Sequence, residues 1–110
     1  MTVSYLVRYE GIPNDPERFH TRYATVHAAI LRDMPGMRSL ILHRPVPWTD
    51  PFPVQPAGVH LLAQMIFDSA TDLDRALASE ARARAREDFA NFPPFEGTVR
   101  HQALRQEVIF

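Results

Sequence analysis

The chain has 110 residues, of which 45% are hydrophobic and 23% charged, and its formal net charge at pH 7 is −1. This balance gives no electrostatic reason to expect binding to nucleic acid or membranes, and the lack of cysteine excludes disulfides and thiolate chemistry. No apolar run approaches the ~20 residues of a membrane span and the N-terminus lacks a signal-peptide pattern, so we expect a cytoplasmic protein.

A strand and a helix are predicted at the N-terminus. β-Branched and aromatic residues recur at every second position from Val3 to Tyr9, which indicates a strand. Gly11 and Pro13 interrupt the alternation and predict a loop. Asp15 is a favoured N-cap and proline suits the first helical turn, so a helix is expected from Pro16 to Asp33.

One stripe of this helix carries the candidate chemistry. Tyr23 and His27 are four residues apart and therefore neighbours on the apolar stripe that begins at Phe19. The phenol is within hydrogen-bonding reach of the imidazole, which can act as an acid or base at neutral pH. We predict Tyr23 and His27 as the catalytic pair, the alternative being a half-buried histidine bonded to a backbone carbonyl. Pro35-Gly36 ends the helix, because glycine permits a positive φ.

A second strand is predicted from Met37 to Pro45, where alternation resumes. The following segment, 45–58, contains five prolines and lacks the backbone donors of a regular sheet. Its apolar side chains, including Trp48, are unusual for a disordered linker. We interpret this segment as a stiff extended loop, which is either a lid or subunit contact or an unspecific surface loop.

The third predicted strand, His60 to Asp68, has one wholly apolar face and one mixed face. The apolar face should lie against helices. The mixed face is too apolar for open water, so we expect a second copy of the sheet to cover it. His43 and His60 lie on mixed faces, where each can line a pocket or an interface.

A second helical region is predicted over residues 71–91, starting with a capping box at Thr71, either as one helix or with a break near Ser79. Alanine and arginine alternate over residues 81–86. We interpret these arginines as a solvated face paired with acidic side chains nearby in the sequence, and a site for an anion is the alternative. Those acidic side chains are Glu80, Glu87 and Asp88.

The last predicted strand runs from Thr98 to Leu104, after a turn at Gly97. The resulting order, βαββαβ, indicates an α+β fold of the ferredoxin-like type, with a four-stranded antiparallel sheet and the helices on one face. The apolar end, 108–110, should pack on the sheet or on a partner. No boundary divides the sequence, so we expect a single domain over residues 1–110.

Two stretches resemble the EthD family of dimeric α/β-barrel proteins. The first is an F…Y…H pattern from Phe19 to His27, followed by the helix stop at Gly36. The second is Ala76 to Phe92, with an Ala-Ser element and a closing Asp-x-x-x-Phe. One departure is Ala29, because the family usually has proline two residues after the histidine.

This resemblance implies a homodimer in which two four-stranded sheets form a barrel, with a pocket between sheet and helices in each subunit. It implies a small apolar or aromatic ligand, and kinship with enzymes that isomerise, cyclise, decarboxylate or oxygenate aromatic compounds and lactones without a bound cofactor. For the pocket we expect these lining residues: Phe19, His43, Trp48, His60, Phe89 and Phe92.

Other kinds of site find little support. His20 and His27 are about 10.5 Å apart along a helix axis, too far to share a metal conveniently, and we expect neither metal nor cofactor. Serine elbows, phosphate-binding loops and dinucleotide fingerprints are absent. Three hypotheses remain: an isomerase, cyclase or lyase with His27 as acid or base; a cofactor-independent monooxygenase holding its substrate beside Trp48; and a non-catalytic accessory or binding protein of a degradation pathway.

Overall fold

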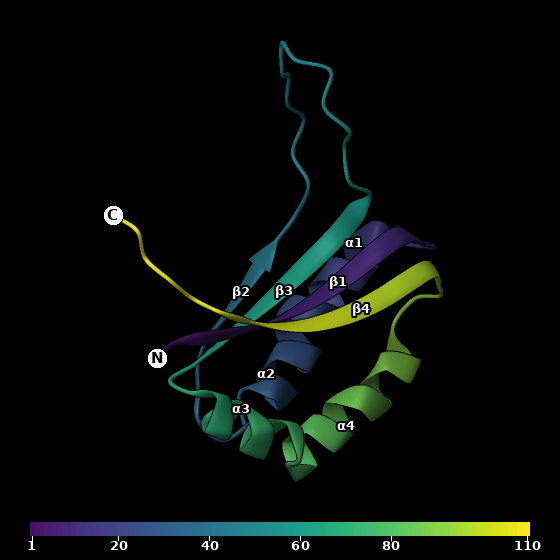
Figure 1. Ribbon diagram of the computed structural model, residues 1–110. Coiled ribbons are helices and arrows are strands. Elements are labelled where there is room, and N and C mark those ends of the chain that lie inside the picture. Colours follow the sequence, from purple (N-terminus) through teal and green to yellow (C-terminus); the bar gives the residue numbers. More distant parts are fainter.

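The computed structural model describes all residues, 1–110, and shows a four-stranded sheet with its helices on one face (Figure 1). The strand order is β2-β3-β1-β4, and neighbouring strands are antiparallel. This arrangement confirms the predicted ferredoxin-like fold. In chain order the elements are β1 (Val3–Pro13), α1 (Pro16–Arg22), η1 (Tyr23–His27), α2 (Ala28–Leu31), β2 (Met37–His43), β3 (Val59–Phe67), α3 (Ala70–Leu77), α4 (Glu80–Asp88), η2 (Phe89–Asn91) and β4 (Phe95–Arg105).

The first helical region matches its prediction closely, because α1, η1 and α2 follow one another without interruption. The side chain of Asp15 caps the start by accepting a hydrogen bond from the backbone N–H of Arg18 at 3.2 Å. Gly36 follows the helix with a φ of +78°, as the sequence predicts. The unpredicted feature is η1, a π-helical turn in the middle.

Strands β1 and β4 are longer than predicted, because Gly11 and Gly97 lie within strands rather than in turns. The two glycines face each other across the β1–β4 pair, with φ values of +139° and +155°. A Cβ atom on Gly11 would collide with the carbonyl of Glu96, and one on Gly97 with the carbonyl of Glu10. The glycines therefore permit a close approach of two backbones inside the sheet.

The second helical region is broken at Ser79, which confirms the predicted alternative of two helices. The Ser79 hydroxyl accepts a hydrogen bond from the backbone N–H of Arg82 at 3.3 Å and caps α4. The predicted cap at Thr71 was wrong. Ser69 caps α3 instead, accepting from the backbone N–H of Asp72 at 3.1 Å, since the helix begins before Thr71.

The core lies between the sheet and the helices, and the other side of the sheet is uncovered in the monomer (Figure 1). Alternate residues of β3 are buried against the helices, as predicted: Leu61, Ala63, Met65 and Phe67. On the uncovered outer face, Ile41 and Leu104 are 41% and 42% exposed. This face therefore presents apolar surface that no element of the same chain covers.

Two segments project from this body, namely residues 44–58 and the C-terminal residues 106–110 (Figure 1). Both carry exposed apolar side chains, such as Phe52 in the loop and Val108 in the tail. The tail does not pack on its own sheet. None of the helices combines the length and the apolar character required to cross a bilayer.

Candidate active site

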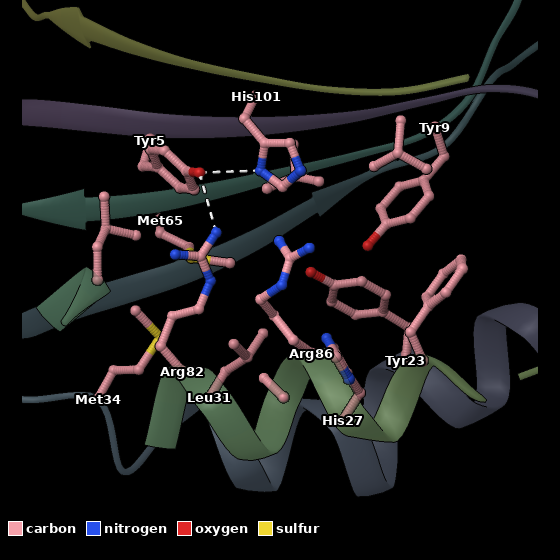
Figure 2. Close-up of a pocket in the computed structure, with 15 residues that line it drawn as sticks. Tyr5, Tyr9, Tyr23, His27, Leu31, Met34, Met65, Arg82, Arg86 and His101 are labelled. Atoms are coloured by element: carbon pink, nitrogen blue, oxygen red, sulfur yellow. Dashed lines mark hydrogen bonds between the residues drawn. The ribbon is translucent and has the colours of Figure 1, made fainter. Parts of the chain in front are cut away.

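A cavity of about 340 Å³ lies between the sheet and the helices (Figure 2). Eleven of its fifteen lining residues are hydrophobic, which is typical of a site for a small organic molecule. Strands β1, β3 and β4 line one side, and η1, α2 and α4 line the other. The aromatic and cationic side chains that line it are Tyr5, Tyr9, Tyr23, His27, Arg82, Arg86, Phe89 and His101.

The π-helical turn η1 positions Tyr23 and His27 at this cavity. Their ring centroids are 4.6 Å apart, and the two side chains are 1% and 5% exposed. The ring of Phe92 packs edge-on against His27 at 5.1 Å. Isolated π-turns are rare and occur frequently at functional sites, so the local backbone marks the same pair that the sequence pattern singles out.

The hydrogen-bond partner of His27 is Asp88, at the end of α4, rather than Tyr23 as predicted. Nδ1 of His27 lies 3.1 Å from Oδ2 of Asp88. Oδ1 of Asp88 accepts from the guanidinium of Arg22 and, at 3.3 Å, from the amide of Asn91. The Asp88 side chain is only 5% exposed. A buried carboxylate with these three donors is a well-satisfied acceptor, and it fixes the orientation of the imidazole.

The protonation state of this pair follows from its contacts. An ionised carboxylate only accepts hydrogen bonds, so the neutral His27 ring carries its proton on Nδ1 and leaves Nε2 as the basic nitrogen. Burial lowers the pKa of His27 below its ordinary value, although the hydrogen bond and charge of Asp88 raise it. Burial also disfavours the Asp88 anion, but hydrogen bonds from Arg22, His27 and Asn91 outweigh it and lower the pKa of Asp88.

Two buried phenols complete this part of the cavity. The rings of Tyr9 and Tyr23 meet edge to face, with centroids 5.9 Å apart. Burial raises the pKa of Tyr9 to about 12. Burial, together with the neighbouring Tyr9 phenol, raises the pKa of Tyr23 well above its ordinary value. Both phenols therefore stay protonated near neutral pH and can donate hydrogen bonds to an oxygen atom of a bound molecule.

We call Arg22, Tyr23, His27 and Asp88 the His27 cluster, and Tyr5, Arg82, Arg86 and His101 the arginine cluster. In the arginine cluster, the Tyr5 hydroxyl is 2.8 Å from Nδ1 of His101 and 3.4 Å from Nη2 of Arg82. Arg82 and Arg86 extend from α4 toward the sheet (Figure 2). Burial lowers the pKa of His101, and the positive charges of Arg82 and Arg86 lower it further.

The predicted salt bridges of residues 81–86 with their sequence neighbours were wrong. Among these arginines only Arg84 forms a salt bridge, with Asp33 at 3.3 Å. Asp88 is occupied by Arg22 and His27. The reason is helical geometry, since side chains four residues apart share a face and the alternation therefore points some arginines inward.

Three of the residues predicted for the site line the cavity together, namely Tyr23, His27 and Phe89. Phe19 and Phe92 lie behind this lining in the aromatic core, with ring centroids 4.9 Å apart. Neither lines the cavity itself, because both rings pack against other aromatic side chains of the core. Phe92 packs against the Tyr23 and His27 rings, and Phe19 packs against Phe92 from behind.

The other three predicted pocket residues, His43, Trp48 and His60, lie away from the cavity. His43 is on the outer face of the sheet and bonds Gln64 at 3.0 Å, because the alternation of β2 turns its neighbours inward. His60 packs against Phe19, with ring centroids 5.7 Å apart. Trp48 is 59% exposed in the projecting loop. No group of three histidine or acidic side chains gathers in a geometry suited to a metal ion.

Sequence reasoning missed several residues of the site: Tyr5, Tyr9, Asp88 and His101. A signal existed for the tyrosines, since Tyr5 and Tyr9 share the inner face of β1. The spacing of Arg82 and Arg86 likewise places both on one face of a helix. Asp88 is the aspartate of the Asp-x-x-x-Phe pattern, but nothing local in the sequence linked it to His27, which is 61 residues away in the chain.

Comparison with known proteins assigns the family. Residues 13–94 match the EthD domain. An uncharacterized 11.0 kDa protein from the thcB-thcC intergenic region of Rhodococcus erythropolis is 28% identical over 80 residues, which are 73% of this chain and 74% of that protein.

Two solved structures share the fold. An EthD family protein from Bacillus halodurans superimposes with a TM-score of 0.76 and 22% identity, covering 97% of this chain and 100% of that one. SnoaB, a cofactor-independent oxygenase from Streptomyces nogalater, superimposes with a TM-score of 0.64 and 17% identity, covering 99% of this chain and 98% of that one. At these identities, the structural likeness establishes the fold alone. The match to the domain covers most of the sequence, and the chain therefore belongs to the EthD family.

Proposed function

We propose that this chain is a cofactor-independent enzyme that transfers a proton on a small aromatic or lactone substrate, as an isomerase, cyclase or lyase. The proposal is carried by the pairing of His27 with the buried Asp88 at a cavity of mainly hydrophobic lining. A neutral imidazole that is fixed by a carboxylate through one nitrogen has the other nitrogen available as a general base.

The proposed step begins at a C–H bond beside a substrate carbonyl group. Nε2 of His27 accepts the proton, the C–H electron pair moves toward the carbonyl oxygen, and an enolate forms. Asp88 stabilises the imidazolium, and the protonated phenols of Tyr9 and Tyr23 donate to the enolate oxygen. Return of the proton to another carbon completes an isomerisation, whereas ring closure or loss of a leaving group gives a cyclase or lyase.

Oxygenation is the second candidate, and it is supported by the shared fold with SnoaB, a cofactor-independent oxygenase. The first step is the same deprotonation by His27. The electron-rich enolate then reduces dioxygen, so that one oxygen atom converts the substrate methylene to a carbonyl and the other leaves as water. Uptake of oxygen therefore separates this candidate from an isomerase, which consumes none.

Phenylpyruvate is a suitable probe because it is aromatic and has an acidic C–H bond beside a carbonyl. Proton NMR in D₂O follows exchange of its benzylic protons, while an electrode records dissolved oxygen. We expect the wild type to accelerate exchange and His27→Gln to lose about 100-fold or more of that rate. Circular dichroism verifies the fold of the variant. Exchange at the uncatalysed rate with the wild type, or full activity of His27→Gln, contradicts the proposal.

We further propose that the functional form is a homodimer in which the outer faces of two sheets meet as a barrel. The support is the uncovered apolar surface around Ile41 and Leu104, which water disfavours. Light scattering at micromolar concentration should give twice the chain mass of 12.6 kDa. Leu104→Asp should lower this mass, because it places a charge in the interface, and a monomeric wild type contradicts the barrel.

A further inference from the structure

The charges at the cavity are unbalanced. Arg82 and Arg86 line it, and none of its fifteen lining residues is an aspartate or glutamate. The nearest buried acid of the site, Asp88, already accepts hydrogen bonds from Arg22, His27 and Asn91. Positive charge therefore faces the cavity without a carboxylate of the chain to neutralise it.

The contrast with Arg84 on the same helix shows that this lack of pairing is specific to the cavity face. Arg84 points away from the cavity and forms a salt bridge with Asp33. The guanidinium of Arg82 hydrogen-bonds only to a neutral hydroxyl, that of Tyr5, and neither Arg82 nor Arg86 forms a salt bridge. Figure 2 shows both guanidinium groups raised from α4 toward the sheet.

The remaining members of the arginine cluster suit an anion as well. Burial and the two guanidinium charges lower the pKa of His101, so its ring is neutral near pH 7. Its Nδ1 is engaged with the Tyr5 hydroxyl at 2.8 Å. Two guanidinium groups beside neutral hydrogen-bonding groups suit a planar carboxylate, because a guanidinium binds a carboxylate through two parallel hydrogen bonds.

We propose that the arginine cluster binds the carboxylate of an aromatic acid, whose ring occupies the apolar part of the cavity beside Tyr9 and Tyr23. The claim that this aromatic acid is the substrate rests on the proposed function, whereas its binding to the arginine cluster requires no chemical step at His27. The substrate class is then an aromatic carboxylic acid with its acidic C–H bond directed at the His27 cluster. Its carboxylate end is held by Arg86 and Arg82.

Isothermal titration with 1-naphthoate and the uncharged 1-naphthamide at pH 7.5 tests this proposal without turnover. We expect naphthoate to bind about ten- to a hundredfold more tightly than naphthamide. Arg86→Gln should remove about tenfold of the naphthoate affinity and leave naphthamide unchanged. The matched control on the same helix, Arg84→Gln, should bind both ligands like the wild type.

Three outcomes would overturn the proposal: equal affinity for naphthoate and naphthamide, full naphthoate affinity in Arg86→Gln, or an equal loss in Arg84→Gln, which would indicate only the general charge of the helix. His27→Gln separates this proposal from the proposed function. We expect it to bind naphthoate like the wild type while losing proton exchange. Naphthoate binding can therefore fail or succeed independently of catalysis.

Discussion

The two clusters that share the cavity differ in how their charges are satisfied. In the His27 cluster, Asp88 and Arg22 neutralise each other and the imidazole is hydrogen-bonded within the chain. In the arginine cluster, Arg82 and Arg86 have no carboxylate partner. The charges of the first cluster are thus neutralised within the chain, although Nε of Arg22 is buried without a hydrogen-bond partner. The second cluster gains a counter-charge only when a ligand binds.

Helix α4 supplies side chains to both clusters, and the depth at which each side chain is buried explains whether its charge is paired within the chain. Asp88 at the end of α4 is 5% exposed, and Arg86 two residues earlier is exposed at the open side of the cavity. A buried ion must be paired within the protein, because the cost of its desolvation is otherwise unmet. A cation at the opening stays hydrated until a ligand arrives. This difference leads to three predictions, taken from the largest effect to the smallest.

Replacing Asp88 with alanine should have the largest effect on stability. The substitution leaves the Arg22 guanidinium and Nδ1 of His27 without their acceptor, so we expect the free energy of unfolding to fall by about 2 kcal/mol. Arg86→Ala should change it by less than about 0.5 kcal/mol. Urea denaturation at fixed protein concentration measures both. Equal losses would mean that the two clusters do not differ in internal pairing.

The Asp88→Asn variant should show how the carboxylate acts on its neighbour. We expect the rate of phenylpyruvate exchange to fall about tenfold, because the imidazole is less firmly held. The charge and hydrogen bond of Asp88 raise the pKa of His27. Without them, the acid limb of the pH profile of kcat/KM should move to lower pH.

Asp33→Asn is the matched control for this measurement. Asp33 also pairs with an arginine, Arg84, but it does so on the exposed surface. The Asp33→Asn variant should leave unchanged both the rate of phenylpyruvate exchange and the acid limb of the pH profile of kcat/KM. An unmoved acid limb in Asp88→Asn would instead assign Asp88 a purely structural role.

The pH dependence of stability should show the smallest effect. The pKa of His27 in the folded state is lowered from 6.5, and those of His60 and His101 are lowered too. Below pH 6.5 the unfolded chain binds protons that the folded chain does not, so stability falls as the pH decreases toward the folded-state pKa values. It should be level above that range.

Scanning calorimetry between pH 5.0 and 7.5 measures this effect as a decrease in Tm of a few degrees. Asp88 does not contribute in this range, because its own lowered pKa affects stability only below its ordinary value of 3.8. His27→Gln and Arg86→Gln should each reduce the decrease, the second by relieving the charge on His101. A Tm that rises on acidification contradicts the assignment of His27 as a buried neutral base.

Much of the fold could be predicted because it depends on local rules. Alternation located the strands, Asp15 and Gly36 bounded the first helical region, and the buried face of β3 followed from its sequence. The errors at Gly11 and Gly97 have one cause. A glycine that opens a turn and a glycine that lets two strands approach closely look alike until the opposing strand is known.

The sequence by itself determined the strand and helix order, the family pattern, and the placement of Tyr23 and His27 together on one face of a helix. Only the tertiary structure decided that Asp88 bonds His27, since that contact spans 61 residues. The same holds for Arg82 and Arg86, whose helical spacing fixes their direction relative to each other. Whether that direction meets water or a cavity depends on how α4 packs against the sheet, which no local periodicity reports.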